Sequence, residues 1–212
     1  FCSIYHGLGM KRKFPLILLI LLSIAFVVSA IDIQDTWLTW LLESMPVIIT
    51  VPILIYSYKK FTFSNFAYLL IFIHSLLLLY GAHYSYAKVP LGYWMEDLFG
   101  FTRNNYDKIG HFMQGFGPVI YARELFLRCT PMNRGRWASF ASFCVAMTVS
   151  ALYEIIEWAA SMTNPKDTEA FLGMQGYIWD TQTDMFMCMI GSLLALTLFS
   201  SFHDKSMGCV EA

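Results

Sequence analysis

The chain has 212 residues, of which 57% are hydrophobic and 14% are charged, and its mean hydropathy is +0.54. Because a soluble domain usually carries about 25% charged residues, this composition indicates a membrane protein. The formal net charge of -1 provides no general basic surface, so we expect no nucleic-acid partner. The five cysteines show no CxxC motif and no paired spacing, so we expect neither a disulfide framework nor a zinc–thiolate site.

The N-terminal segment combines a basic cluster with an apolar run. We expect residues 1–9 to be a non-native or disordered extension and residues 10–212 to form a single transmembrane domain of six helices. The run that starts at Met10, MKRKFPLILLILLSIAFVVSA, also resembles a signal peptide, because Val28 and Ala30 fit a small-residue cleavage pattern. We favour an uncleaved first helix, since an apolar bundle follows directly. The intact mass of the mature chain decides between the two.

Six apolar segments are candidates for membrane-spanning helices, because about 20 mainly apolar residues cross a bilayer. In chain order they are Phe14–Ala30, Trp37–Tyr58, Phe63–Tyr84, Tyr106–Leu127, Trp137–Ala160 and Asp180–Phe202. Lipid offers free backbone groups no hydrogen-bond partner, so spanning segments of this length must be helical. The predicted fold class is all-α, an integral membrane bundle of about six transmembrane helices.

Basic residues set the expected orientation of this bundle. With the N-terminus in the cytoplasm, ten Lys and Arg fall in cytoplasmic segments and four in the opposite ones, so we expect both termini to be cytoplasmic. Residues 85–105 and 161–179 then lie on the extracytoplasmic side, and both contain aromatic residues, Gly and Pro. Such loops either cover a site or lie against lipid headgroups, and the sequence leaves both options open.

Polar residues form stripes on the fourth, fifth and sixth of these segments. At 3.6 residues per turn each stripe lies on one helix face. The stripes consist of Asp107, His111 and Gln114, of Glu154 and Glu157, and of Asp180 and Asp184. In the expected orientation the ionisable residues lie within roughly 10 Å of the outer boundary, at 1.5 Å per residue. His83 ends the third segment on the same side and could join them.

Several carboxylates and a histidine at one depth favour a bound cation. A charge at the centre of a span costs about 2.5–3.5 kcal/mol, and like charges at one level repel. A divalent metal removes this repulsion, and a histidine with carboxylates suits zinc, manganese or iron. The candidate metal ligands are His83, Asp107, His111, Glu154, Glu157, Asp180 and Asp184. Glu154 and Glu157 are also the candidate catalytic residues.

Other interpretations of these residues stay open. Asp107 or Asp180 could cap the start of its helix. The two glutamates could share a proton or pair with Arg103 and Lys108, and His111 could be a neutral histidine bonded to Glu154.

Two further groups of polar residues are expected to have structural roles. Arg123 and Glu124 lie at the cytoplasmic end of the fourth span, where we expect them to snorkel or to pair locally. His74 lies about 180° from His83 around the third span, so the two cannot share a face. We therefore interpret His74 as a lone core histidine.

Four segments resemble the YjdF-type family of multi-pass bacterial inner-membrane proteins, a family of unknown function. They are YGAHYSYAKVPLG, RNNYDKIGHFMQGFGPVIYARELFLR, SALYEIIEWAA and FLGMQGYIWDTQTDM. The likeness covers most of the chain but not residues 1–9, and it implies a membrane bundle in the bacterial cytoplasmic (inner) membrane without any activity. Residues that match the family pattern are His83, Tyr84, Asp107, His111, Gln114, Glu124, Glu154, Glu157, Gln175, Asp180 and Asp184.

Three classes of function fit these features, and the lipid bilayer is a partner in each. The first is a metal-dependent enzyme, in which a metal-bound water attacks a lipid or envelope-precursor ligand and a carboxylate is the general base. The second is a cation or proton transporter, since intramembrane acids mark ion paths, although few polar residues continue inward. The third is a non-catalytic membrane partner or scaffold. The sequence does not set the oligomeric state.

Overall fold

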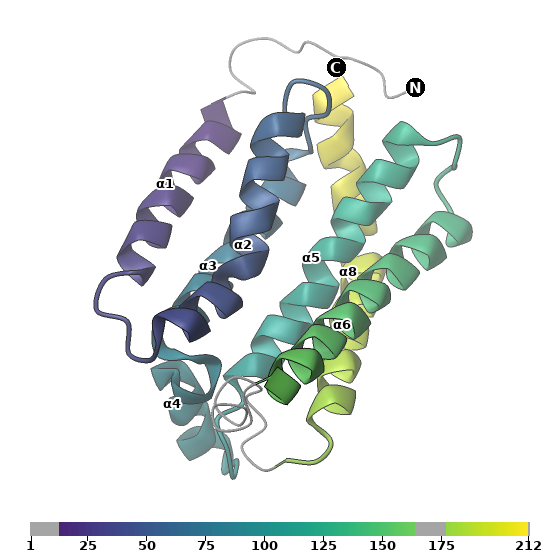
Figure 1. Ribbon diagram of the computed structural model, residues 1–212. Helices are drawn as coiled ribbons and strands as arrows, with labels where there is room; N and C mark the ends of the chain where they lie inside the picture. Colours follow the sequence, from purple (N-terminus) through teal and green to yellow (C-terminus); the bar gives the residue numbers. More distant parts are fainter. Residues whose placement is uncertain (1–12, 164–176, 212) are drawn as a thin grey trace.

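Seven α-helices form the part of the chain that the computed structural model describes, residues 13–163 and 177–211 (Figure 1). They are α1 (Lys13–Ser29), α2 (Trp37–Ser57), α3 (Asn65–Tyr84), α4 (Pro90–Phe99), α5 (Tyr106–Cys129), α6 (Arg136–Thr163) and α8 (Asp180–Glu211), with a short 3-10 helix, η1 (Tyr86–Lys88). No strand occurs within these ranges, so the all-α prediction is confirmed.

Four of these helices, α2, α3, α6 and α8, are long and apolar enough to cross a membrane. The helix α1 is apolar but has only 17 residues. The helix α5 has 24 residues but falls outside this group because of its polar side chains. The described residues therefore establish several apolar membrane helices, while the count of six spans and the cytoplasmic position of the termini stay predictions. The start of α1 and the end of α8 lie at the same end of the bundle (Figure 1).

The segment 85–105 is not a simple loop, because it contains η1 and α4. Pro90 occupies the first turn of α4, where its fixed φ suits a helix start. Gly100 ends α4 in the left-handed region, with φ of 68°, which a residue without a Cβ adopts freely. At the other end of the chain, α8 continues past the predicted end at Phe202 to Glu211.

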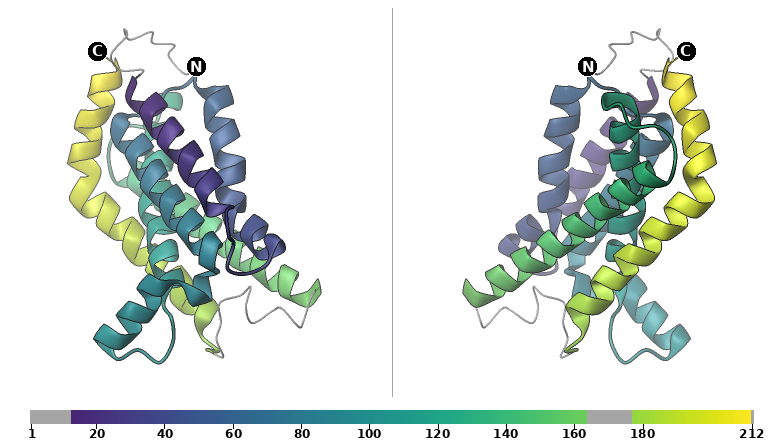
Figure 2. Two further views of the ribbon diagram at one scale, coloured as in Figure 1. Left: turned by 90° about the vertical axis from the view of Figure 1, so that its left-hand side faces the viewer. Right: turned by 90° about the vertical axis from the view of Figure 1, so that its right-hand side faces the viewer.

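The helix α5 is the central element of the bundle, packed along α8, α6 and α3 (Figure 2). Gly115 and Gly191 allow α5 and α8 to approach closely. A Cβ at Gly115 would collide with the backbone carbonyl of Cys188, and a Cβ at Gly191 with that of Phe112. The two backbones therefore touch, and this contact fixes how α5 and α8 cross.

The helices α1 and α2 are attached to the bundle through α3. The helix α2 contains two prolines, Pro46 and Pro52, and it packs against α3 and, through Trp40 and Val47, against α1. Large apolar side chains cover the outside of the bundle, as a bilayer requires, among them Ile17, Ile24, Ile53, Ile156 and Leu198.

The cysteines differ in one respect from the expectation. Cys129, the last residue of α5, is disulfide-bonded, which the spacing of the cysteines did not indicate. Cys144 and Cys188 carry free thiols.

Candidate metal centre

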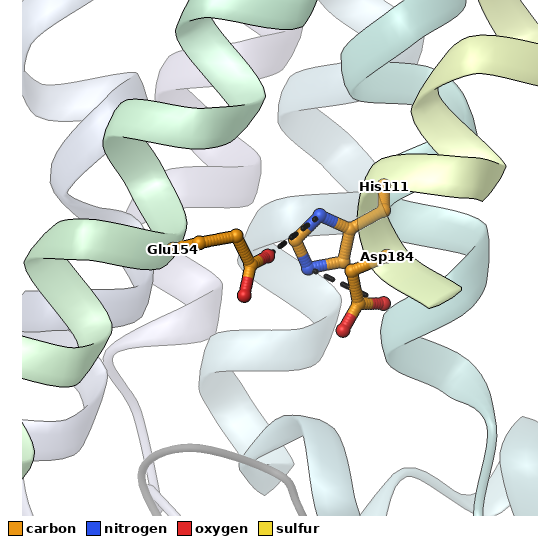
Figure 3. Close-up of side chains that lie close together, drawn as sticks. All are labelled: His111, Glu154 and Asp184. Carbon is orange, nitrogen blue, oxygen red and sulfur yellow. Dashed lines mark ion pairs between the residues drawn. The ribbon is translucent and has the colours of Figure 1, made fainter. Parts of the chain in front are cut away.

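His111 lies on α5 between carboxylates from two other helices (Figure 3). Its Nδ1 is 3.6 Å from Oε1 of Glu154 on α6, and its Nε2 is 3.6 Å from Oδ1 of Asp184 on α8. All three side chains are buried. The structure thus brings together one residue from each of the three predicted stripes.

Gln114 determines which nitrogen of His111 is available to a ligand. Nδ1 of His111 lies 3.0 Å from Oε1 of Gln114, three residues further along the same helix face. Because a carboxamide oxygen only accepts, Nδ1 must carry the proton and donate it. Nε2 then has a free lone pair, which is the arrangement that a histidine ligand of a metal requires.

Glu154 adds an independent sign of a missing ligand. Its side chain is 7% exposed, and Oε1 has no hydrogen-bond partner among the described residues. A buried carboxylate oxygen without a partner is costly, so such oxygens normally bind a donor or a cation. One donor atom from each of His111, Glu154 and Asp184 lies within 4.8 Å of the others. Glu154 lies on the Nδ1 side of the ring and Asp184 on the Nε2 side, so a single ion shared by all three residues requires these side chains to reorient.

Two basic side chains lie beside this group and pair with its aspartates. Arg103 lies 3.0 Å from Asp107 and 2.6 Å from Asp180, and Lys108 lies 2.6 Å from Asp180 and 2.8 Å from Asp184. Asp107, Asp180 and Asp184 also have geometry for a metal, but the ammonium group of Lys108 already lies among them. The structure therefore contains the ion pairs that were an open alternative, with aspartates rather than glutamates.

The cluster around His111 carries more negative than positive charge. The five acids of the three stripes face two basic side chains, Arg103 and Lys108, within the described residues. A buried carboxylate without compensation destabilises a protein by several kcal/mol. The surplus must be relieved by bound protons or by a cation, and the side of the cluster away from Lys108, around His111 and Glu154, is where the compensation is lacking.

A cavity of about 310 Å³ adjoins this centre. His111, Asp184 and the half-buried Glu157 line it at one end, and Tyr121 lines it further along α5. His74, interpreted from the sequence as a lone core histidine, also lines this cavity. The predicted catalytic residue Glu157 is thus placed beside a space that a small ligand or part of a lipid can occupy.

The remaining predicted residues lie apart from this centre. Nδ1 of His83 is 3.2 Å from the carbonyl oxygen of Ser29 at the end of α1, and the structure does not bring His83 to the metal centre. Tyr84 packs edge-on against Tyr80 and His83. Gln175 lies outside the described residues.

A second buried polar cluster lies at the other end of α5. Glu124, fully buried, accepts hydrogen bonds from the backbone N and the hydroxyl of Ser64, both at 2.7 Å. It also lies 2.6 Å from Nη1 of Arg128 and 3.0 Å from Nε2 of His203. Arg123, 4% exposed, pairs with Asp204 at 2.7 Å.

The cluster around Glu124 corrects one expectation. Local pairing of Glu124 is confirmed by its ion pair with Arg128, but Arg123 and Glu124 are buried and do not snorkel. Sequence reasoning did not find His203, because it lies beyond the predicted end of the last span.

Glu43 is another buried acid that sequence reasoning did not single out. It lies on α2 and is 2% exposed. Its Oε1 accepts from the hydroxyl of Ser85 at 3.4 Å and from the backbone N of Tyr86 at 3.3 Å. Because an acid inside an apolar span is energetically costly, its position in the sequence alone is enough to identify Glu43 as a candidate functional residue. Ser85 has φ of 70°, a conformation that a residue with a Cβ adopts only when its surroundings hold it.

Apolar helices around a buried polar centre define a multi-pass helical membrane protein. The chain belongs to the family of predicted membrane proteins DUF2238, whose model matches residues 14–205. It is 39% identical over 186 residues to the inner membrane protein YjdF of Escherichia coli (strain K12), covering 88% of each chain. The family resemblance is thus confirmed, and the protein is a multi-pass protein of the bacterial inner membrane. No solved structure matches the chain.

Proposed function

We propose that this protein is a membrane-embedded, metal-dependent hydrolase that acts on a lipid or envelope precursor near the extracytoplasmic face. The observation that supports it best is the buried, unpartnered Oε1 of Glu154 beside His111. Asp184 completes a set of three ligands, which is the number that leaves a coordination position open for water in catalytic zinc sites.

The other residues of the centre have roles that follow from their positions. Gln114 holds the His111 ring through Nδ1, so that Nε2 faces Asp184. A bound zinc, manganese or iron ion supplies a water nucleophile near neutral pH. Glu157 lies three residues from Glu154 and lines the cavity, so with such an ion bound it would be the general base that accepts a proton. Arg103 and Lys108 keep the neighbouring aspartates in place.

Metal analysis of the purified protein tests this proposal. We expect one zinc, manganese or iron ion per chain, and loss of that ion in His111→Ala and Glu154→Gln. His83→Ala is the matched control, because His83 lies on the same side but outside the centre, and it should keep the ion. A wild-type protein without stoichiometric metal, or one whose metal content is unchanged by His111→Ala, would contradict the proposal.

Transport of a cation or proton is the second candidate, and the depth of the cavity favours it. The cavity is lined by α5 residues from Asp107 to Tyr121, about 21 Å along the helix at 1.5 Å per residue. Gln114 and His74 lie along this path. Flux in proteoliposomes that is abolished by Glu154→Gln would support transport, and no flux above that of empty vesicles would exclude it.

A further inference from the structure

The shape and lining of the cavity bear on how a substrate reaches the proposed centre. One end is polar, with His111, Asp184 and Glu157. The rest is lined largely by apolar groups from α2, α3, α5 and α6, including Val47, Ile71, Leu78, Pro118 and Val149. A space that is polar at one end and apolar along its length matches an amphiphile rather than a small polar solute.

The cavity reaches the outside of the bundle between α2 and α6. Thr50 on α2 and Val149 on α6 both line the cavity, and both are exposed, Val149 by 40%. Along their described residues α2 and α6 have no packed interface with each other. The exposed neighbours of these positions, Ile53 on α2 and Leu152 on α6, are apolar, so the opening faces hydrocarbon.

The depth of this opening sets how a ligand would lie. Val149 precedes Glu157 by eight residues on α6, which corresponds to about 12 Å along the helix. A chain that enters between Thr50 and Val149 therefore runs along the cavity for about this length before its end reaches the polar group at the outer level.

Entry from the outer side is restricted by Tyr86. The 3-10 helix η1 follows α3 at that end, and the ring of Tyr86 lines the cavity. The ring lies in contact with Gly81, where any Cβ would collide with it, and stacks on Tyr106 with centroids 6.0 Å apart. Glu43 on α2 accepts hydrogen bonds from the hydroxyl of Ser85 and from the backbone N of Tyr86.

From these observations we infer that the cavity takes up the apolar chain of a membrane amphiphile from the bilayer, through the opening between Thr50 and Val149. The polar end of the amphiphile then lies at His111, Glu154 and Asp184. This assignment of the polar end rests on the proposed metal centre, whereas uptake of the chain rests on the cavity and its opening alone.

Photocrosslinking in vesicles tests the inference. The probe is phosphatidylglycerol with a diazirine in the middle of one acyl chain, mixed into phosphatidylethanolamine vesicles that contain the full-length protein. We expect adducts on cavity residues such as His74 and Tyr153, located by mass spectrometry of the peptides. Adducts confined to outward-facing residues such as Ile53 and Ile156 would overturn the inference.

Two variants test the route of entry. Val149→Trp and Thr50→Trp each fill the opening from a different helix, and we expect both to lose the cavity adducts. Ile156→Trp is the control, because Ile156 is 60% exposed on α6 and does not line the cavity. If one variant fails to fold, as judged by size exclusion in detergent, the other decides. Unchanged cavity adducts in a folded variant would overturn lateral entry.

Metal content measured on the same samples separates the two proposals. Cavity adducts without stoichiometric metal would refute the metal centre and leave uptake of the chain standing. Stoichiometric metal without cavity adducts would refute the uptake alone. A substrate that enters from water would show itself as metal binding with adducts only on the outside of the bundle.

Discussion

Nε2 of His203 lies 3.0 Å from Oε2 of Glu124, and neither side chain is accessible to solvent. Around this pair, Ser64, which caps the start of α3, and Arg128 on α5 satisfy the carboxylate. Nearly all the polar atoms of the cluster at this end of the bundle have hydrogen-bond partners. Glu154 at the other end, by contrast, has a buried oxygen without a partner. Satisfied buried networks rigidify a fold, and incomplete ones mark places where something else binds.

Removal of Glu124 should destabilise the bundle strongly. Glu124→Ala leaves the partly buried Arg128 without its carboxylate and the backbone N of Ser64 without its acceptor, and breaking a buried pair in this way costs about 3–5 kcal/mol. Unfolding in mixed detergent measures the change in the free energy of unfolding. The control is Lys88→Ala, which removes an ion pair whose lysine is 52% exposed and should cost less than about 1 kcal/mol. Equal effects of the two variants would contradict the structural role of the cluster around Glu124.

Lys108→Ala should create a second metal site. The ammonium group of Lys108 lies 2.6 Å from Asp180 and 2.8 Å from Asp184, and these two acids with Asp107 place oxygens within 4.8 Å of one another. Without the lysine, a divalent cation is the simplest way to offset their repulsion. We expect the variant to bind one more manganese ion per chain than the wild type and to be stabilised against heat by added manganese. A variant that is destabilised and is not stabilised by manganese would show that a metal ion cannot replace the ammonium group of Lys108.

Gly191→Ala should weaken both folding and metal binding. The added methyl group meets the carbonyl of Phe112, so α5 and α8 must move apart, and with them His111 and Asp184. Overpacking of this kind typically costs about 1–3 kcal/mol. The matched control is Gly208→Ala, also on α8, where the new methyl group meets nothing within 4 Å. It should stabilise the helix by up to about 1 kcal/mol. Metal affinity by isothermal titration should fall in the first variant only.

The sequence predicts the three outer stripes because two physical rules act on them together. Spacing of three or four residues places Glu154 with Glu157, and Asp180 with Asp184, on one helix face. Chain direction then places all three stripes at the same depth. The structure confirms that His111, Glu154 and Asp184 converge. Whether they bind a metal stays a prediction.

The spacing of residues along a helix does not predict how that helix is rotated about its own axis within the bundle. His83 has the expected depth, but its ring faces the end of α1, because the packing of α1 on α3 sets its direction. The same limit applies to His74, whose place beside the cavity depends on how α2 and α5 flank α3. The sequence identifies Arg103 and Lys108 as possible ion-pair partners of the acids, but only tertiary packing determines that they pair with aspartates and not with glutamates.

The two prolines of α2 have a mechanical consequence. A proline inside a helix removes the hydrogen bond to the carbonyl four residues earlier, so Pro46 and Pro52 weaken the helix at Leu42 and Ile48. Pro46 lies at the wall of the cavity, and α2 has no packed interface with α6 across the opening. The helix beside the opening can therefore bend outward while the backbone contact between α5 and α8 keeps the donor atoms in register. The α2 wall of the cavity is therefore deformable, whereas the α5–α8 core that carries His111 and Asp184 is rigid.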